Sequence, residues 1–307
     1  MSDLVRLDTD GSHASAGGPT VPGMGDPSVD DRSFPSARSG SMEPTAVSVR
    51  PSFFRRSLRW VIALALLGAS AVAVWPSFDL LGHHDDPVGA AAVGELDGRP
   101  VAVSAGSGPD DTTLRVWDLA THEPFGDPMI GHTDFVSTVA LGEVNGRAVA
   151  VTGSVDGTIR MWDLTTREQI GDPMTNGAGV GDVALGRVDG RQIAVSSDDK
   201  DVRVWDLTTH RLIGAPMPAG HVHGVRTVVV EEINGRPVAL TGGGDDENGG
   251  GAVRVWDLRT RRPVGERMRY ANWVGDVAVG HVGGKVVAVT GDGDGDVRVR
   301  DLSAYAR

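Results

Sequence analysis

An alternation of apolar and polar positions typical of β-strands recurs five times in the chain. The clearest copy spans 145–164, NGRAVAVTGSVDGTIRMWDL, which reads as a hairpin turn, a strand, a second turn and a strand ending in Trp-Asp. The hairpin glycine returns in frame at Gly98, Gly146, Gly190, Gly235 and Gly284. A Ser or Thr follows each of these glycines six residues later. Successive hairpin glycines are 44 to 49 residues apart, close to the length of one four-stranded propeller blade.

These copies resemble the WD40 repeat over 82–302. The Trp-Asp pair recurs at 117–118, 162–163, 205–206 and 256–257, while Arg300-Asp301 stands in the fifth copy. A Gly-His pair opens three copies, at 82–83, 131–132 and 220–221. The resemblance implies that a His, a strand hydroxyl, a turn Asp and a Trp lock each blade by hydrogen bonds. The residues given this structural role are His83, His132, His221, Thr152, Asp156, Trp117, Trp162, Trp205 and Trp256. Only the second copy has all four at standard spacing, so we expect the other blades to be looser.

The expected fold is all-β, a WD40-type β-propeller with five recognisable blades over 77–307. The repeats lie at about 82–130, 131–175, 176–219, 220–269 and 270–307. Proline in the fourth strand of a unit predicts an edge strand. The fifth copy stops after its third strand, so we expect residues 78–81 to complete it and close the ring. An open arc, or pairing with a second chain, is the alternative, which leaves the oligomeric state open.

The N-terminal quarter has a different composition. Residues 1–56 are rich in Ser, Gly and Pro, which predicts a disordered tail. Arginines at 55, 56 and 59 precede a charge-free apolar run over 60–75, so we expect a transmembrane helix over 57–76 that acts as a signal-anchor. The flanking charges place the tail in the cytoplasm and the propeller outside, in a single-pass protein of the cell membrane. Small residues within the run leave cleavage and export as the alternative. This layout is similar to that of a membrane-anchored, bacterial-type WD40 repeat protein.

Charge and composition narrow the chemistry. The net charge of −12 argues against nucleic acid as a partner, and the absence of cysteine excludes disulfides and thiolate metal sites. Acidic residues crowd the turns between the second and third strands, and such a rim favours a basic partner. Asp292, Asp294 and Asp296 copy part of a calcium loop, but the later ligands of that loop are missing. We therefore expect no metal or cofactor.

We expect a non-enzymatic scaffold that binds proteins or peptides and is displayed by the membrane anchor. The candidate partner-binding residues are exposed loop aromatics and nearby polar groups: Phe135, Asp134, His223, Trp273, Asp245, Asp246 and Glu247. An extracytoplasmic propeller enzyme of the hydrolase or lactonase type is one alternative. A ligand-sensing ectodomain is the other.

Overall fold

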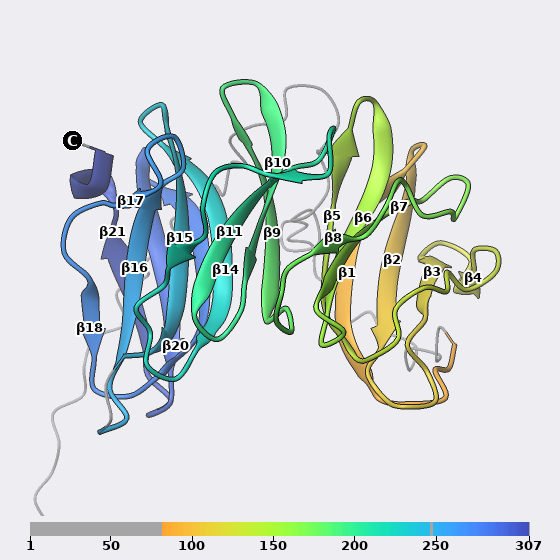
Figure 1. Cartoon of the computed structure of the whole chain (residues 1–307), viewed down its shortest axis with the longest axis horizontal. Helices are drawn as coiled ribbons and strands as arrows, with labels where there is room; N and C mark the ends of the chain where they lie inside the picture. Colours follow the sequence, from red (N-terminus) through yellow and green to blue (C-terminus); the bar gives the residue numbers. More distant parts are fainter. Residues whose placement is uncertain (1–81, 246–247, 307) are drawn as a thin grey trace, which may run out of the picture. The chain divides into compact units, whose positions relative to one another are not determined.

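The computed structural model describes residues 82–245 and 248–306. In this part of the chain five antiparallel sheets follow one another along the sequence, and we call them blades 1 to 5 (Figure 1). The predicted all-β fold is therefore confirmed for the described residues. The predicted tail at 1–56, the predicted membrane helix at 57–76 and the closing segment at 78–81 lie outside them. Among the residues described, no helix is both long enough and apolar enough to cross a membrane.

Each blade is built by consecutive strands, with the first strand innermost. Blade 1 comprises β1 (Val88–Leu96), β2 (Arg99–Gly106), β3 (Leu114–Asp118) and β4 (Glu123–Pro124). Blade 2 comprises β5 (Val136–Val144), β6 (Arg147–Ser154), β7 (Thr158–Asp163) and β8 (Met174–Thr175). Blade 3 comprises β9 (Asp182–Val188), β10 (Arg191–Ser197), β11 (Asp201–Asp206), β12 (Arg211–Leu212) and β13 (Met217–Pro218). Blade 4 comprises β14 (Val225–Ile233), β15 (Arg236–Gly244), β16 (Gly251–Asp257), β17 (Arg262–Pro263) and β18 (Met268–Tyr270). Blade 5 comprises β19 (Val274–Val282), β20 (Lys285–Asp292) and β21 (Val297–Asp301), followed by the short 3-10 helix η1 (Ser303–Ala306).

The hairpin between the first and second strands has the predicted geometry in every blade. In blade 2, Asn145 and Gly146 have φ values of 51° and 79°. Both central residues of such a two-residue turn need positive φ, which Asn, Asp and Gly tolerate best. The turn fixes the register of β5 and β6, so that Val144 lies opposite Arg147 and Leu141 lies opposite Ala150.

The outer edge of the blades differs from the expected continuous fourth strand. In blade 3, β12 and β13 both pair with β11, and a turn with Gly214 at φ 71° separates them. Blade 1 is broken in the same way around Gly126, after which Met129 pairs with Leu114 through an isolated bridge. The prolines at 128, 173 and 216 lie directly before the paired residues Met129, Met174 and Met217. They therefore remove no N–H donor from the hydrogen bonds between the outer strands. Among the described residues, blade 5 has three strands.

The core consists of four hydrophobic clusters, one between each pair of successive blades. Each blade has a tryptophan face, which carries the Trp of its third strand, and a valine face, which carries the apolar residues that alternate with it. Between blades 1 and 2, Trp162 and Leu164 on the tryptophan face of blade 2 pack against Val103 and Val116 on the valine face of blade 1. The other clusters repeat this arrangement. Each blade therefore covers the valine face of the blade before it.

The blades are joined in series from 1 to 5. Strand β1 packs beside β5, β5 beside β9, β9 beside β14, and β14 beside β19. Figure 1 shows blade 1 in orange and yellow and blade 5 in blue at opposite ends of this series. On blade 1 Val93 is exposed, and on blade 5 Val297 and Val299 are exposed. The five expected blades are present, and in the described residues they form an open arc.

Candidate interaction face

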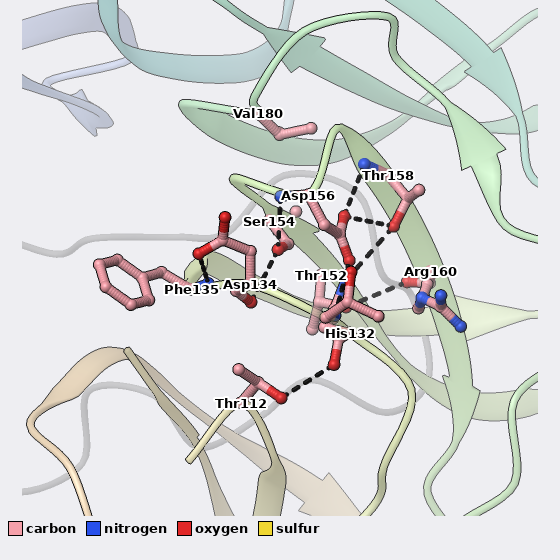
Figure 2. A network of polar contacts seen from close by, with 12 residues as sticks. Thr112, His132, Asp134, Phe135, Thr152, Ser154, Asp156, Thr158, Arg160 and Val180 are labelled. Atoms are coloured by element: carbon pink, nitrogen blue, oxygen red, sulfur yellow. Dashed lines mark hydrogen bonds and ion pairs between the residues drawn. The ribbon is translucent and has the colours of Figure 1, made fainter. Parts of the chain in front are cut away.

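Blades 1 and 2 each contain a complete hydrogen-bonded set of four side chains, which we call the tetrad. In blade 2 the His132 ring is 2.8 Å from Asp156 through Nδ1 and 2.8 Å from the Thr152 hydroxyl through Nε2 (Figure 2). Trp162 Nε1 donates to the same hydroxyl at 2.9 Å. The network is satisfied when Nδ1 carries the proton, since the carboxylate then accepts and the hydroxyl donates to Nε2. The tetrad ties the loop before β5 to the turn before β7.

The tetrad of blade 1 uses His84. The His84 ring lies 2.8 Å from Asp111 and 2.7 Å from Ser104, and Trp117 Nε1 donates to Ser104 Oγ at 2.7 Å. The sequence-based choice of His83 was wrong, because the tetrad histidine stands twenty residues before the hydroxyl in both blades and His83 is exposed. Blade 1 also has all four members, although not at the spacing of the second copy. Blade 1 accommodates a longer turn and still brings Asp111 to the histidine.

In blade 3 an asparagine takes the place of the histidine. The Ser196 hydroxyl donates to Asn176 Oδ1 at 2.8 Å, and Asn176 Nδ2 donates to Asp198 at 3.3 Å. Trp205 Nε1 completes the set by donating to Ser196 at 2.9 Å. An amide has both a donor and an acceptor, so it reproduces the two contacts of a neutral imidazole.

Blade 4 keeps the histidine but loses its bond to the acid. His221 Nε2 lies 3.0 Å from the Thr241 hydroxyl, while His221 Nδ1 stays 3.6 Å from Asp245 and has no hydrogen-bond partner. Asp245 pairs instead with Arg254 and Arg267. The sequence suggested that Asp245 contacts a partner. Because Asp245 is buried and paired with two arginines, it is not positioned to do so.

Blade 5 has neither the histidine nor the tryptophan. Tyr270 stands twenty residues before Thr290, whose hydroxyl donates to the Tyr270 oxygen at 3.1 Å. Arg298 lies over the Tyr270 ring at 5.5 Å and pairs with Asp292. The position of the Trp is taken by Arg300, which is exposed. This blade is therefore held by a different and smaller set of polar contacts.

The recurring arginines neutralise much of the acidic rim. They precede the Trp position by two residues. In four blades they form ion pairs within their own blade: Arg115 with Asp111, Arg203 with Asp198, Arg254 with Asp245, and Arg298 with Asp292. The carboxylates nearest the blade core are thus already paired. Asp246 and Glu247 lie outside the described residues.

The three aspartates of the partial calcium loop make polar contacts within their own turn and with Arg298. Asp292 Oδ1 accepts hydrogen bonds from the backbone N–H groups of Asp294 and Asp296, and Arg298 bridges Asp292 and Asp296. In the described part of the chain, no three His, Cys, Asp or Glu side chains converge to hold a metal ion. In this arrangement Arg298 pairs with two of the three carboxylates that a calcium ion would need.

The tetrads shift the pKa values of their members. Burial raises the pKa of Asp111, but hydrogen bonds from Thr113, His84 and Asp85 outweigh it and hold that pKa well below its usual range. Burial lowers the pKa of His132. The pKa of His221 falls to about 4, first through burial and then through Arg254. The tetrad histidines of blades 2 and 4 are therefore neutral at pH 7.

The strongest polar feature that the sequence did not reveal is Asp182 on the innermost strand of blade 3. Its Oδ1 accepts from the Thr138 hydroxyl of blade 2 at 2.8 Å, and its Oδ2 accepts from the Val228 backbone of blade 4 at 2.7 Å. Burial raises its pKa. The sequence did contain a signal for this contact, because Asp182 stands at the position that Thr138 occupies on the innermost strand of blade 2. Because both oxygens are bonded, Asp182 joins three blades.

The exposed candidates lie on loops at one end of the blades. In blade 2 the Val155 backbone N–H donates to the Phe135 carbonyl at 2.9 Å, and in blade 5 the Gly293 N–H donates to the Trp273 carbonyl at 2.9 Å. Phe135 and Trp273 each expose 40% of their surface. In Figure 2, the Phe135 ring points away from the tetrad. His223 is exposed on the corresponding loop of blade 4, and Asp134 is half-buried beside Phe135.

Comparison with known proteins supports the repeat assignment. Residues 127–163 and 175–206 match the family model described as "WD domain, G-beta repeat". The chain therefore contains WD40 repeats, and its β-propeller-like sheets agree with this class. A solved structure titled "Crystal structure of the computationally designed Ika8 protein: crystal packing No.1 in P63" is similar in fold, with a TM-score of 0.53 and 22% identity. The match covers 73% of this chain and spans only 61% of that one. A search of curated proteins returned no match.

Proposed function

We propose that this chain is a non-enzymatic scaffold that binds a protein or peptide on the loop end of its blades. The supporting observation concerns one repeated position. The residue before the first core valine has its carbonyl bonded to the neighbouring turn in blades 1, 2 and 5, where it is Pro87, Phe135 and Trp273. The backbone is thus held alike while the side chains differ. The fold does not require exposed aromatic rings there, and exposed aromatics are the commonest anchors of protein interfaces.

The surroundings of the two rings suit such an interface. Val155 is exposed on the turn that bonds to Phe135, and the Arg226 guanidinium lies 4.6 Å over the Trp273 ring. An aromatic ring with an arginine across its face offers an apolar surface and a fixed charge together. In blade 2 the tetrad fixes the loop that carries Phe135, so little conformational entropy is lost when this loop binds a partner.

The membrane anchor belongs to the same proposal. The charge-free run at 60–75, with arginines on its N-terminal side, supports a single-pass helix that displays the blades on the extracytoplasmic side. Membrane fractionation of cells expressing the full chain tests this. The full 32.1 kDa chain should remain in the membrane after washing at high salt, whereas a shorter soluble form would indicate cleavage and export.

The binding site is tested by site-specific photo-cross-linking of the full chain in its own membrane. A photoreactive amino acid is placed at Phe135, at Trp273 or, as the control, at Leu212 on the outer strand β12. We expect the same partner to be captured from Phe135 and Trp273 and not from Leu212. Phe135→Ala and Trp273→Ala should then each weaken binding of the purified partner by about tenfold or more. Equal capture from all three positions, or unchanged affinity, would contradict the proposal.

A further inference from the structure

Adjacent blades are locked by side chains that fill the space left by glycines. Leu141 of blade 2 lies over Gly94 of blade 1, where an added Cβ would come within 3.0 Å of Leu141 Cδ1. Leu185 lies in the same way over Gly142, with a corresponding distance of 2.8 Å. Val230 of blade 4 lies over Gly186, with a distance of 2.2 Å. One residue on the first strand of blades 2, 3 and 4 therefore occupies a glycine gap on the preceding blade.

A second series of gaps lies on the second strands. A Cβ added at Gly153 of blade 2 would come within 2.4 Å of Val180, and one added at Gly242 of blade 4 would come within 3.0 Å of Val274. The two series act together at one interface. Blade 3 inserts Val180 and Leu185 into Gly153 and Gly142 of blade 2.

The two ends of the arc carry the unmatched halves of this interface. On the valine face of blade 5, the gap positions are Gly280 and Gly291, and no described atom lies within 4 Å of a Cβ built at either. On the tryptophan face of blade 1, the inserting positions are Val93 and Val88, which are 56% and 53% exposed. The equivalents of Val88 in the other blades are at most 6% exposed.

The rest of each end face follows the same pattern. Val297 and Val299 on β21 are 74% and 63% exposed, whereas the equivalent Val253 and Val255 of blade 4 are buried by blade 5. An exposed row of β-branched residues of this kind is rare on a monomer surface. The exposed row on blade 5 is equivalent to the valine faces that are covered by a tryptophan face at the interfaces within the chain.

From this match we infer that two copies of the chain associate head to tail, with the tryptophan face of blade 1 in one copy packed on the valine face of blade 5 in the other. Val93 of one copy would then fill the gap at Gly280 of the second, and Val88 the gap at Gly291. The occupant is a second copy because the interface continues one that the chain already builds four times. Such a heterologous interface closes into a ring when the rotation between copies allows it, and a pair of copies is the smallest such assembly.

Disulfide trapping tests the pairing directly, because the natural chain contains no cysteine. Full-length Val93→Cys and Gly280→Cys chains carrying different tags are purified in detergent, mixed and mildly oxidised. We expect a disulfide-linked species of twice 32.1 kDa that contains both tags. Val93→Cys mixed with Leu212→Cys is the matched control, since Leu212 lies on the outer strand of the middle blade.

The outcomes separate the possible occupants. Cross-linking of Val93→Cys with Gly280→Cys above the control pair supports the head-to-tail pairing. If the double variant Val93→Cys/Gly280→Cys forms its disulfide within a single chain, the ends of one copy close on each other and the inference fails. It also fails if the two mixed variants cross-link no more than the control pair.

Sedimentation of the unmodified full chain provides the second measurement. We expect a protein mass of two chains at micromolar concentration. Gly280→Arg should reduce this to one chain with unchanged circular dichroism, because a Cβ at this position has no described atom of its own copy within 4 Å. Leu212→Arg should retain the mass of two chains. A single-chain mass for the unmodified protein, or a two-chain mass for Gly280→Arg, would overturn the inference.

Discussion

The carboxylate of Asp111 offers the sharpest test of how the tetrads hold the blades. It accepts hydrogen bonds from His84, the Asp85 backbone, the backbone and hydroxyl of Thr113, and Arg115. Its neighbour Asp110 lies in the same turn and is exposed. Asp111→Ala removes a carboxylate that belongs to the tetrad. Asp110→Ala removes a carboxylate at the adjacent position outside the tetrad and serves as the control.

The expected loss at Asp111 is about 3 kcal/mol of unfolding free energy. A hydrogen bond to a charged group contributes about 1.5–3 kcal/mol, and several such bonds to one carboxylate do not add fully. The truncation also leaves the buried His84 Nδ1–H without its acceptor, which costs about 1–3 kcal/mol within that total. Asp110→Ala should stay within about 0.5 kcal/mol of the unmodified protein.

Urea unfolding followed by tryptophan fluorescence and circular dichroism measures both variants. The pKa of Asp111 is lower in the folded state, so its contribution is present above the unfolded pKa of about 3.9 and is lost as the pH falls through the folded value. The difference between Asp111→Ala and the unmodified chain should therefore be constant near pH 7 and shrink below about pH 4. A loss of under about 0.5 kcal/mol at pH 7 would refute the view that the tetrad stabilises blade 1.

Two further predictions concern a glycine gap and a buried histidine. Gly186→Ala should destabilise the protein by about 1–3 kcal/mol because its Cβ meets Val230, and adding Val230→Ala should recover part of this in urea melts; no recovery would show that the strain lies elsewhere. His221 should titrate with a pKa of about 4 in NMR spectra, and unfolding free energy should fall as the pH drops from about 6.5 towards 4, since the unfolded histidine binds the proton first. His221→Asn, which copies the Asn176 of blade 3, should flatten this slope, and an unchanged slope would contradict the assignment.

The sequence predicted the local β-structure well because turn chemistry is local. Asn145-Gly146 and its equivalents set the hairpins, and alternating apolar residues set which face of each strand is buried. The same reasoning misplaced the first histidine at His83, since a Gly-His pair is a weaker guide than distance along the chain. Counting twenty residues back from the hydroxyl finds His84 and also Tyr270.

What the sequence could not provide depends on contacts between distant residues. Asp245 pairs with Arg254 on β16 and with Arg267, which directly precedes β18. The sequence does not indicate that these two side chains reach the same carboxylate. The break in the outer strand follows from the backbone at Gly214, whose positive φ no periodicity reveals. The two arginines hold Asp245 inside the blade, although composition alone placed it on an acidic rim.

Blade-to-blade packing explains why the repeats can differ so much in their polar sets. His132, Asn176 and Tyr270 occupy one position in three blades, with different hydrogen-bond capacity, yet each contacts its strand hydroxyl. Burial of apolar surface between successive blades contributes far more free energy than one polar contact, so the polar set can vary while the packing is kept. The interblade contacts vary as well: Val230 fills the space over Gly186, whereas the position equivalent to Gly186 in blade 4 is Glu231. Each interface is therefore packed by its own combination of side chains.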